Sequence, residues 1–437
     1  MACQLVHDLY NADGSPKAGK DVTLGDVLIE GKTKIVYDLP SYKGCVAIKS
    51  KDRITCGDGA RAHDMEGKAV ISNSTNSSLM KILNDAGIPT HFLGKWSDNV
   101  FHAHRCYMVP IEWVTRRVAT GSFLKRNPGV TEGHRFSPVK LETFYKDDAN
   151  HDPQWSREQI ISAKIQCGDK VIGADDVDIM EKMTVLIFEI LEKAWTGANC
   201  ALIDMKIEFG VSAGTGDIVL ADIIDSDSWR LWPSGDKRLM VDKQVYRDMA
   251  EVTKDGMETV KRNFQWVAEK VKEIMPKKVS QVVVFMGSAS DMAFCQKIQT
   301  YLEKLHLPCS MRVTSAHKCT ESTLKLLAEY EGEGIPTVII AVAGRSNGLG
   351  PVLAGNTNLP VINCPPLSSN WEQEDLWSSL RLPSGLGCAT VIFPEAAAIH
   401  AAQILALSNE RLWAKMRVLT FKNWLGVKKS DISSRIC

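Results

Sequence analysis

The sequence predicts two folded parts of different class, an α+β part followed by an α/β part with a parallel sheet. Its 437 residues suffice for two or three domains. Short apolar segments alternate with polar loops in the first half, whereas longer continuous apolar runs alternate with helical segments after residue 280. We therefore expect a leader over 1–20, a first domain over 21–256, a connecting helix and linker over 257–279, and a second domain over 280–437.

The leader and the first domain differ in pattern. Gly14, Pro16 and Gly19 interrupt the leader, which is expected to be loose. Glycines and small polar residues at 212–216 predict a hairpin, and apolar residues at helical spacing predict a helix over 178–195. The expected strands cover residues 35–37, 46–48, 106–111, 201–207 and 218–223.

An apolar stripe at steps of three and four residues, from Met257 to Ile274, predicts the connecting helix, and Pro276 stops it. In the second domain, continuous apolar runs at 282–286, 337–343 and 359–362 are typical of fully buried strands. Because helical segments lie between them, a parallel sheet is expected.

Composition and charge narrow the function classes. The 52 basic and 52 acidic residues cancel, so no overall attraction to nucleic acid or to a membrane surface is expected. The twelve cysteines form no CxxC pair, which is typical of reduced thiols in a cytoplasmic protein. The N-terminal residues lack a signal-peptide pattern, and no apolar run is long enough to span a membrane.

Two basic segments of the first domain suit anionic ligands. In EGKTK at 30–34, Lys32 and Lys34 are two residues apart, so on a strand they would share one face and suit a polyphosphate. The P-loop pattern is absent, and an exposed basic turn is the alternative. Arg116 and Arg117 precede a small-residue turn ending at Ser122. Their guanidinium groups match carboxylates or phosphates, with a charged surface strand as the alternative.

Charged residues alternate with apolar ones over residues 204–208. On a strand, Asp204, Lys206 and Glu208 would share one face, and a hairpin could bring Glu208 to Asp222. Paired carboxylates opposite a polyphosphate commonly hold Mg²⁺, although a solvated sheet face would look the same. Polar residues beside tryptophans at 225–232, followed by 242–247, indicate either a substrate-binding loop or an ordinary exposed loop.

Five motifs in order give the first domain a specific resemblance. They are EGKTKIVY at 30–37, RRVATGSFLKR at 116–126, IDMKIEFG at 203–210, LADIIDSDSWRLW at 220–232 and DKQVYR at 242–247. Together they resemble phosphoribosylaminoimidazole-succinocarboxamide (SAICAR) synthetase. That family joins L-aspartate to carboxyaminoimidazole ribotide (CAIR) with ATP, and its α+β fold has a kinase-like ATP cleft.

The resemblance implies a role for each matching residue. Lys32, Lys34 and Lys206 would bind ATP, and Glu208 and Asp222 would hold Mg²⁺. CAIR or aspartate would be bound by Arg116, Ser122, Asp204 and Arg230. The segment TCGDGAR at 55–61 departs from the Ser-Ala-Phe-Asp motif of many bacterial relatives, so its role stays open.

Three loops of the second domain follow expected strands. GSASD at 287–291 precedes a helix, whose N-terminus can bind an anion, although such turns are common. SAHK at 315–318 carries a histidine, which titrates near neutral pH but is more often structural. The glycines of 343–351 indicate either close approach to a ligand or a flexible connection. Parallel sheets bind ligands at such strand ends.

With LPSGLG at 382–387, these loops resemble aminoimidazole ribotide (AIR) carboxylase. The mutase kind of that family has SAHR and a histidine-bearing glycine loop. This chain instead has Lys318 and no histidine between His317 and His400, and it resembles the kind that uses CO₂ without ATP or biotin. The resemblance implies His317 as base and Lys318 as the stabiliser of the new carboxylate. AIR and CO₂ would be bound by Ser288, Ser290, Asp291, Ser315, Gly344, Ser346 and Gly348.

The two resemblances support each other, because the carboxylase product is the synthetase substrate. Fusions of this kind are the animal arrangement, and they imply a homo-octamer built on the carboxylase domains, with small-molecule substrates only. One alternative is a mutase in the second domain. The other is a non-catalytic ribotide-binding scaffold, which would predict loss of Lys32, Glu208, Asp222 or His317, yet all four are present.

Overall fold

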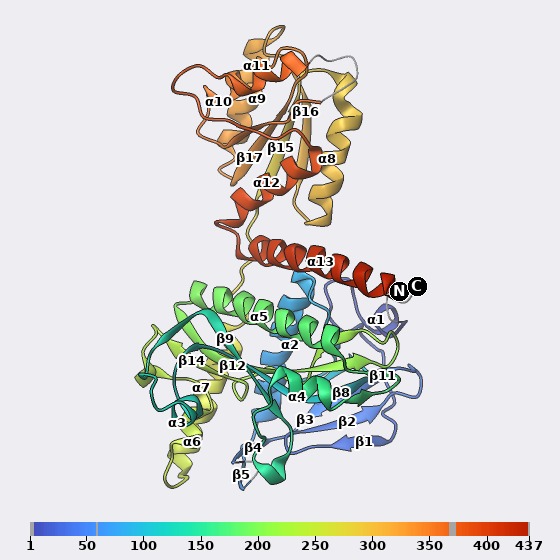
Figure 1. Ribbon diagram of the computed structural model, residues 1–437, viewed down its shortest axis with the longest axis vertical. Helices are drawn as coiled ribbons and strands as arrows, with labels where there is room; N and C mark the ends of the chain where they lie inside the picture. Colours follow the sequence, from blue (N-terminus) through green and yellow to red (C-terminus); the bar gives the residue numbers. More distant parts are fainter. Residues whose placement is uncertain (1–3, 58–59, 367–372, 436–437) are drawn as a thin grey trace. The chain divides into compact units, whose positions relative to one another are not determined.

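The computed structural model describes residues 4–57, 60–366 and 373–435 (Figure 1). The chain divides into two compact units. One combines Met1–Pro276 with Thr420–Cys437, and the other is Lys277–Leu419. Among the described residues, no helix is long and apolar enough to cross a membrane.

An antiparallel sheet of five strands forms the first layer of the first unit. Its order is β1 (Val27–Glu30), β2 (Lys34–Asp38), β3 (Cys45–Ser50), β7 (Val100–His104) and β6 (Phe92–Lys95). A separate hairpin, β4 (Arg53–Cys56) with β5 (Arg61–Asp64), follows β3. Residues 58 and 59, within the segment 55–61, lie outside the described residues.

A second antiparallel sheet carries most of the predicted site residues. It runs β13 (Ile218–Ala221), β12 (Cys200–Ser212), β8 (Cys106–Val118) and β9 (Arg135–Tyr145), with β14 (Trp229–Pro233) also on β12. The predicted hairpin is confirmed, since β12 and β13 pair antiparallel with Glu208 opposite Ala221. A small pair, β10 (Gln166–Cys167) and β11 (Lys170–Val171), lies apart.

Helices bury their apolar stripes against these sheets. The predicted helix is α5 (Ala174–Gly197), which buries Met180, Ile187 and Leu191 at steps of four and seven residues. The other helices of this region are α2 (Lys68–Ala86), α3 (Ser122–Arg126), α4 (Arg157–Ser162) and α6 (Gln244–Arg247), with 3₁₀ turns at Asp148–Asn150 and Lys237–Leu239.

The expectation of a loose leader is wrong for residues 4–10. They contain α1 (Gln4–Leu9), whose Leu5 and Leu9 are fully buried with Leu39 and Ala47. Tyr10 Oη donates to the Gly94 carbonyl oxygen at 2.9 Å. Two leucines four residues apart place both side chains on one helical face, and this burial holds the segment against the first sheet.

The predicted connecting helix belongs to the first unit. It is α7 (Lys254–Lys270), begins at the Thr253 cap and ends before Ile274. Its stripe, represented by Val260 and Phe264, packs with Ile54 and Tyr246. The stripe is therefore core surface of the first unit, and the separate assignment of 257–279 is corrected.

The second unit is built on a wholly parallel sheet, as predicted. The strand order is β16 (Cys309–Val313), β15 (Gln281–Met286), β17 (Thr337–Val342), β18 (Val361–Asn363) and β19 (Ala389–Thr390). Alternate residues of β15 point to opposite faces of the sheet. Both sets are apolar and buried, and helices cover both faces (Figure 1). One face packs against α8 (Met292–Lys304) and α12 (Pro394–Ala406), and the other against α9 (Thr320–Gly332) and α10 (Leu349–Ala354).

The remaining elements of the second unit are short. They are α11 (Trp377–Leu380) and the 3₁₀ turns Ala289–Asp291 and Gln373–Leu376.

The last helix corrects the expected boundary of 280–437. This helix, α13 (Glu410–Ser434), begins in the second unit, but residues from Thr420 onward belong to the first. Ion pairs hold the end of this helix against α5. Lys428 Nζ lies 2.6 Å from Asp175 and 2.8 Å from Asp178 of α5, and Arg435 lies 3.0 Å from Asp175.

Candidate functional sites

A cluster of lysines and carboxylates lies on one face of the second sheet. Lys206 Nζ donates to Glu112 at 2.7 Å and to Glu208 at 2.9 Å. Lys146 Nζ donates to both oxygens of Glu208, at 3.0 and 2.9 Å. Lys34 pairs with Asp222, which directly follows β13. The cluster therefore combines residues from β2, β8, β12 and the ends of β9 and β13.

Charge, not burial, decides the protonation of this cluster. Burial alone would raise the pKa of Asp222, but the charges of Lys34 and Lys206 hold it below its usual value. Burial opposes the charged form of Lys206, yet Glu208 and Glu112 raise its pKa above the usual value. Asp222 and Lys206 are thus held in their charged forms, which are the forms that bind a metal ion and a polyphosphate.

Lys32 does not share a strand face with Lys34, so that expectation is corrected. Strand β2 begins at Lys34, and Lys32 lies in the preceding turn. Its Nζ is 2.8 Å from Asp148, with both side chains largely exposed. Because Lys32 lies outside the strand, its side chain does not follow the alternation of β2. The role of Lys32 in binding ATP stays a prediction.

An arginine cluster surrounds Asp204, where β12 pairs with β8 and β14. Arg116 pairs with Glu142 and, at 3.1 Å, with Asp204. Arg230 donates to the same Asp204 oxygen at 2.5 Å. In register, Asp204 lies between Arg116 of β8 and Arg230 of β14, which explains why these three residues meet.

The small-residue turn closes over this arginine cluster. A Cβ on Gly121 would lie 2.5 Å from Nη2 of Arg230, and Gly121 has φ +59°, so a glycine is needed there. Ser122 follows at the start of α3 and is exposed. Arg116, Asp204 and Arg230 are therefore joined by ion pairs, and Ser122 directly follows the glycine that lies on Arg230.

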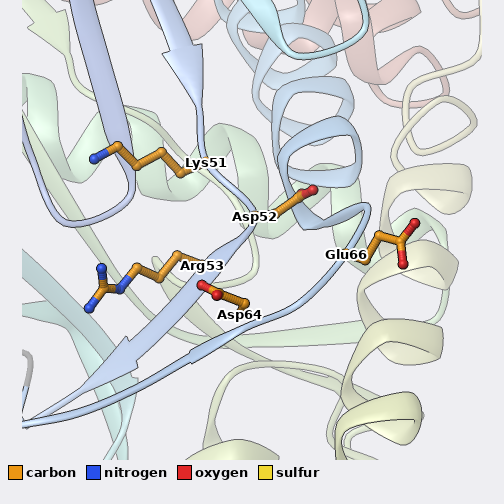
Figure 2. A pocket seen from close by; sticks show the side chains of 5 residues that line it. All are labelled: Lys51, Asp52, Arg53, Asp64 and Glu66. Carbon is orange, nitrogen blue, oxygen red and sulfur yellow. The ribbon is translucent and has the colours of Figure 1, made fainter.

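A shallow cavity of about 390 Å³ lies next to the β4–β5 hairpin (Figure 2). Its lining side chains come from Lys51, Asp52, Arg53, Asp64 and Glu66, none of which was predicted as a site residue. Two of these groups already have partners. Lys51 Nζ donates to Glu30 and to the Gly31 carbonyl oxygen, and Asp52 accepts from the Ala69 amide. Lys51 thus ties one wall of the cavity to the turn that contains Lys32.

In the second unit, the predicted loops follow β15, β16 and β17, and their strands are adjacent in the sheet. A Cβ on Gly348 would lie 2.5 Å from Nε2 of His317, so the imidazole lies directly on this glycine. Ser346 precedes it, and the Ser346 carbonyl oxygen accepts from the Gly348 amide at 2.9 Å. His317, Lys318 and Ser346 are exposed, whereas Gly344 is half-buried.

The first of these loops is organised by its own serines. Ser290 donates to Ser288 Oγ at 2.8 Å, and Asp291 ends the same 3₁₀ turn. Burial raises the pKa of the Asp291 carboxyl.

In the second loop, the Ser315 amide donates to the Cys319 thiol at 3.3 Å. The structure thus groups Ser288 with Ser290 and Asp291, and His317 with Gly348, while Lys318 extends into solvent.

A buried amide network fixes the glycine loop. Asn347 Nδ2 donates to Asn363 at 2.8 Å and to Ser379 at 3.0 Å, and Asn347 Oδ1 accepts from the Gly350 amide at 2.9 Å. Asn347 and Asn363 are almost fully buried. The loop that faces His317 is therefore rigidly held and is not a flexible connection.

Comparison with known proteins assigns both units. The SAICAR synthetase family model matches residues 27–263, and the AIR carboxylase model matches residues 281–423. A Drosophila melanogaster bifunctional phosphoribosylaminoimidazole carboxylase/phosphoribosylaminoimidazole succinocarboxamide synthetase is 61% identical over 93% of this chain and 95% of its own length. The chain belongs to this bifunctional family.

Other relatives agree with this assignment. The human bifunctional carboxylase/synthetase is 56% identical over 95% of this chain and 98% of its own length. A crystal structure of the Ehrlichia chaffeensis synthase is 28% identical, with a TM-score of 0.51, and covers 58% of this chain and all of that one. The bifunctional carboxylase/synthetase of purine biosynthesis therefore has a ligase in its first unit and a lyase in its second.

Some residues of the carboxylase/synthetase sites were missed by sequence reasoning. Lys146 and Glu112 belong to the synthetase cluster, and Gln244 contacts Arg230 at 3.1 Å. Glu112 lies opposite Glu208 in the β8–β12 register, so the pairing of the strands was the missing information. The carboxylase network of Asn347, Asn363 and Ser379 joins residues from three separate segments in the same way.

Proposed function

We propose that the first unit condenses CAIR with L-aspartate using Mg-ATP on the face of β12 that carries Asp204, Lys206 and Glu208. The observation that carries this proposal is the juxtaposition on one strand of the lysine–carboxylate cluster at Lys206 and Glu208 with the arginine cluster at Asp204. One cluster suits a polyphosphate and a metal ion, and the other suits an anionic substrate. A synthetase structure that is 28% identical, with a TM-score of 0.50, is described as a complex with ADP, which supports nucleotide binding here.

The donor set fits a magnesium nucleotide. Glu208 offers a buried carboxylate and Asp222 a half-buried one, and carboxylate oxygens are the protein ligands that Mg²⁺ prefers when phosphates complete its shell. Lys34, Lys146 and Lys206 now neutralise those carboxylates. Incoming phosphate oxygens offer the ammonium groups alternative partners, which leaves the carboxylates to the metal. Bound Mg²⁺ would neutralise charge on the phosphates.

The chemistry requires positioning more than a protein nucleophile. The γ-phosphoryl group passes to the CAIR carboxylate, and the aspartate amine then attacks the acyl carbon, releasing phosphate and losing a proton. Arg116, Ser122, Arg230 and Asp204 would orient the ribotide and aspartate, while Lys32, Lys34 and Lys206 would hold ATP. No covalent protein intermediate is needed.

The second unit would carboxylate AIR with CO₂ and use neither ATP nor biotin. The enamine carbon of AIR attacks CO₂, and His317 removes the proton left on that carbon. Lys318 would stabilise the new carboxylate, and Ser346 with the backbone of Gly344 and Gly348 would hold CO₂. Ser288, Ser290, Asp291 and Ser315 would bind the ribotide. The contact between His317 and Gly348 supports this arrangement, because it places the base against the loop.

Assembly and location are part of the same proposal. We expect a homo-octamer through the second units, which expose Trp377, Leu380 and Phe393. We also expect a cytoplasmic protein, and the ten described cysteines are free thiols, which agrees with a reducing compartment. Light scattering of the purified chain measures the oligomer directly, and a dimer or monomer would contradict this part.

Omission of single reactants tests the activities. The purified chain is incubated with AIR, bicarbonate, L-aspartate and Mg-ATP, each component is left out in turn, and products are followed by mass. We expect CAIR without ATP, and SAICAR only when ATP, Mg²⁺ and aspartate are all present. Carboxylation that requires an N-carboxylated ribotide would instead identify a mutase and overturn the roles given to Lys318 and Ser346.

A further inference from the structure

A second guanidinium group lies next to Arg230 without a carboxylate partner. Gln244 Oε1 accepts from Arg230 Nη2 at 3.1 Å and from Arg247 Nη1 at 3.4 Å. Arg230 also pairs with Asp204, but among the described residues Arg247 has no carboxylate within ion-pair distance. One neutral amide oxygen therefore holds two arginines together, and the carboxylates of Asp227, Asp242 and Asp204 act on Arg247 only from beyond ion-pair distance.

The short helix α6 explains this arrangement. Its sequence places Gln244 and Arg247 three residues apart and Lys243 and Arg247 four apart, so the three side chains lie toward one side. Asp242 fixes the start of the helix by accepting from the Gln244 amide at 2.8 Å and from the Leu231 amide of β14 at 2.9 Å. The helix is thereby tied to the strand that carries Arg230.

The β4–β5 hairpin fixes the other end of α6. Arg61 donates to the carbonyl oxygens of Met249 at 2.8 Å and Tyr246 at 2.5 Å, and its guanidinium lies 4.7 Å from the centre of the Tyr246 ring. His63 is 2.8 Å from Tyr246 Oη. Arg61 thus satisfies carbonyl oxygens at the helix end, and a role emerges for part of the segment 55–61 that sequence reasoning left open.

The surroundings are rich in positive charge. Lys243 is 9% exposed and pairs with Asp227 at 3.4 Å, and the buried Lys68 binds the same carboxylate at 3.1 Å. Burial lowers the pKa of Lys243, and the charges of Arg247 and Lys68 act in the same direction against that of Asp227. An anion at this position would relieve the repulsion among these cations.

We propose that Arg247 is a further substrate-binding residue of the synthetase, which joins Arg230 in holding the phosphate group of the ribotide. Two forked guanidinium groups beside a lysine suit a phosphate monoester dianion better than a single carboxylate. Gln244 and Arg61 act through Arg247 and are positioning residues. This inference rests on the proposed binding of the ribotide at Arg116, Ser122 and Arg230.

Steady-state kinetics of Arg247→Gln with CAIR supplied directly test this inference. We expect the KM for CAIR to rise about 10-fold or more, because a charged hydrogen bond to phosphate is lost. The KM for Mg-ATP, the KM for aspartate and AIR carboxylation should not change. Arg238→Gln is the matched control, since Arg238 is exposed and pairs with its neighbour Asp236. The dephosphorylated riboside should show no difference between Arg247→Gln and the parent chain.

Gln244→Glu provides an independent measurement that does not depend on removing a cation. The substitution keeps the shape of the side chain and places a carboxylate between the two guanidinium groups, where it competes with the phosphate. We expect a similar rise in the KM for CAIR, with the KM for ATP unchanged.

Three outcomes separate this inference from the proposed function. An unchanged KM for CAIR in Arg247→Gln, or a rise confined to the KM for aspartate, overturns it. A rise in Arg230→Gln with no rise in Arg247→Gln also overturns it, while leaving the proposed function intact. If Arg230→Gln and Arg116→Gln both leave the KM for CAIR unchanged, the proposed ribotide site itself is wrong.

Discussion

Lys206 donates a hydrogen bond of 2.9 Å to Glu208, its neighbour two positions along β12. Both side chains project from one face of the strand, and the Glu208 carboxylate is 3% exposed. Burial opposes the charged form of Lys206, and the Glu208 carboxylate is the largest charge that raises the pKa of this lysine. The pair is therefore central to the synthetase cluster.

Lys206→Met should inactivate the synthetase while sparing the carboxylase. Loss of the ammonium group removes a charge that would meet the transferring phosphoryl group, and kcat for SAICAR formation should fall about 100-fold or more. Carboxylation of AIR by the same preparation should not change. Lys81→Met is the control, because Lys81 is exposed and pairs only with Asp85 four residues on. Equal synthetase activity in both variants would contradict the role of Lys206.

Gly348→Ala should impair the carboxylase alone. The added Cβ would lie 2.5 Å from Nε2 of His317, so the imidazole must move. A displacement of about 1 Å can cost a factor of about 100 in rate, and we expect a loss of that size in kcat for carboxylation. Gly332→Ala is the control, since a Cβ there meets nothing within 4 Å. Unchanged carboxylation in Gly348→Ala would show that His317 is not the base.

Asp242 should make the stability of the first unit depend on pH. Burial raises the pKa of this fully buried carboxyl from 3.8 to about 6. Between these values the unfolded chain has lost a proton that the folded chain keeps, so the free energy of unfolding falls as pH rises. The fall is complete above about pH 6 and amounts to roughly 3 kcal/mol. Urea unfolding of the parent chain and Asp242→Asn from pH 4 to 7 measures it.

The comparison with Asp242→Asn isolates this effect from other titrations. The difference in unfolding free energy between the parent chain and the variant should shrink from pH 4 to pH 6 and then stay constant. A difference that is constant throughout would show that Asp242 titrates normally.

Cys319 should be the first described cysteine to react with iodoacetamide. It is exposed, and hydrogen bonds from the Ser315 amide and the Thr314 hydroxyl lower the pKa of its thiol. Because it lies two residues from His317, alkylation should block carboxylation and leave SAICAR formation intact. Peptide mapping identifies the modified residue, and Cys319→Ser should protect the activity. Loss of carboxylation in that variant under the same treatment would contradict the prediction.

Patterns within single segments predicted much of the fold and part of the site. The continuous apolar runs of the second unit predicted its buried strands, and the alternation of Asp204, Lys206 and Glu208 predicted that they share one face. Pairing between distant segments could not be read in this way. Glu112 lies at the site because of the β8–β12 register, and Gln244 because α6 places it beside Arg230. Lys32 is not on the expected strand face, because β2 begins only at Lys34.

Because Thr420–Cys437 belongs to the first unit, the chain cannot be separated into its two units by one cut. Along the chain, the second unit lies between two segments of the first. A single cut near residue 276 would leave Asp175 and Asp178 without Lys428, and would leave the excised half with a terminal helix whose native partners are missing. Separate expression of the halves therefore calls for two cuts, with the C-terminal helix restored to the ligase as a short appended segment.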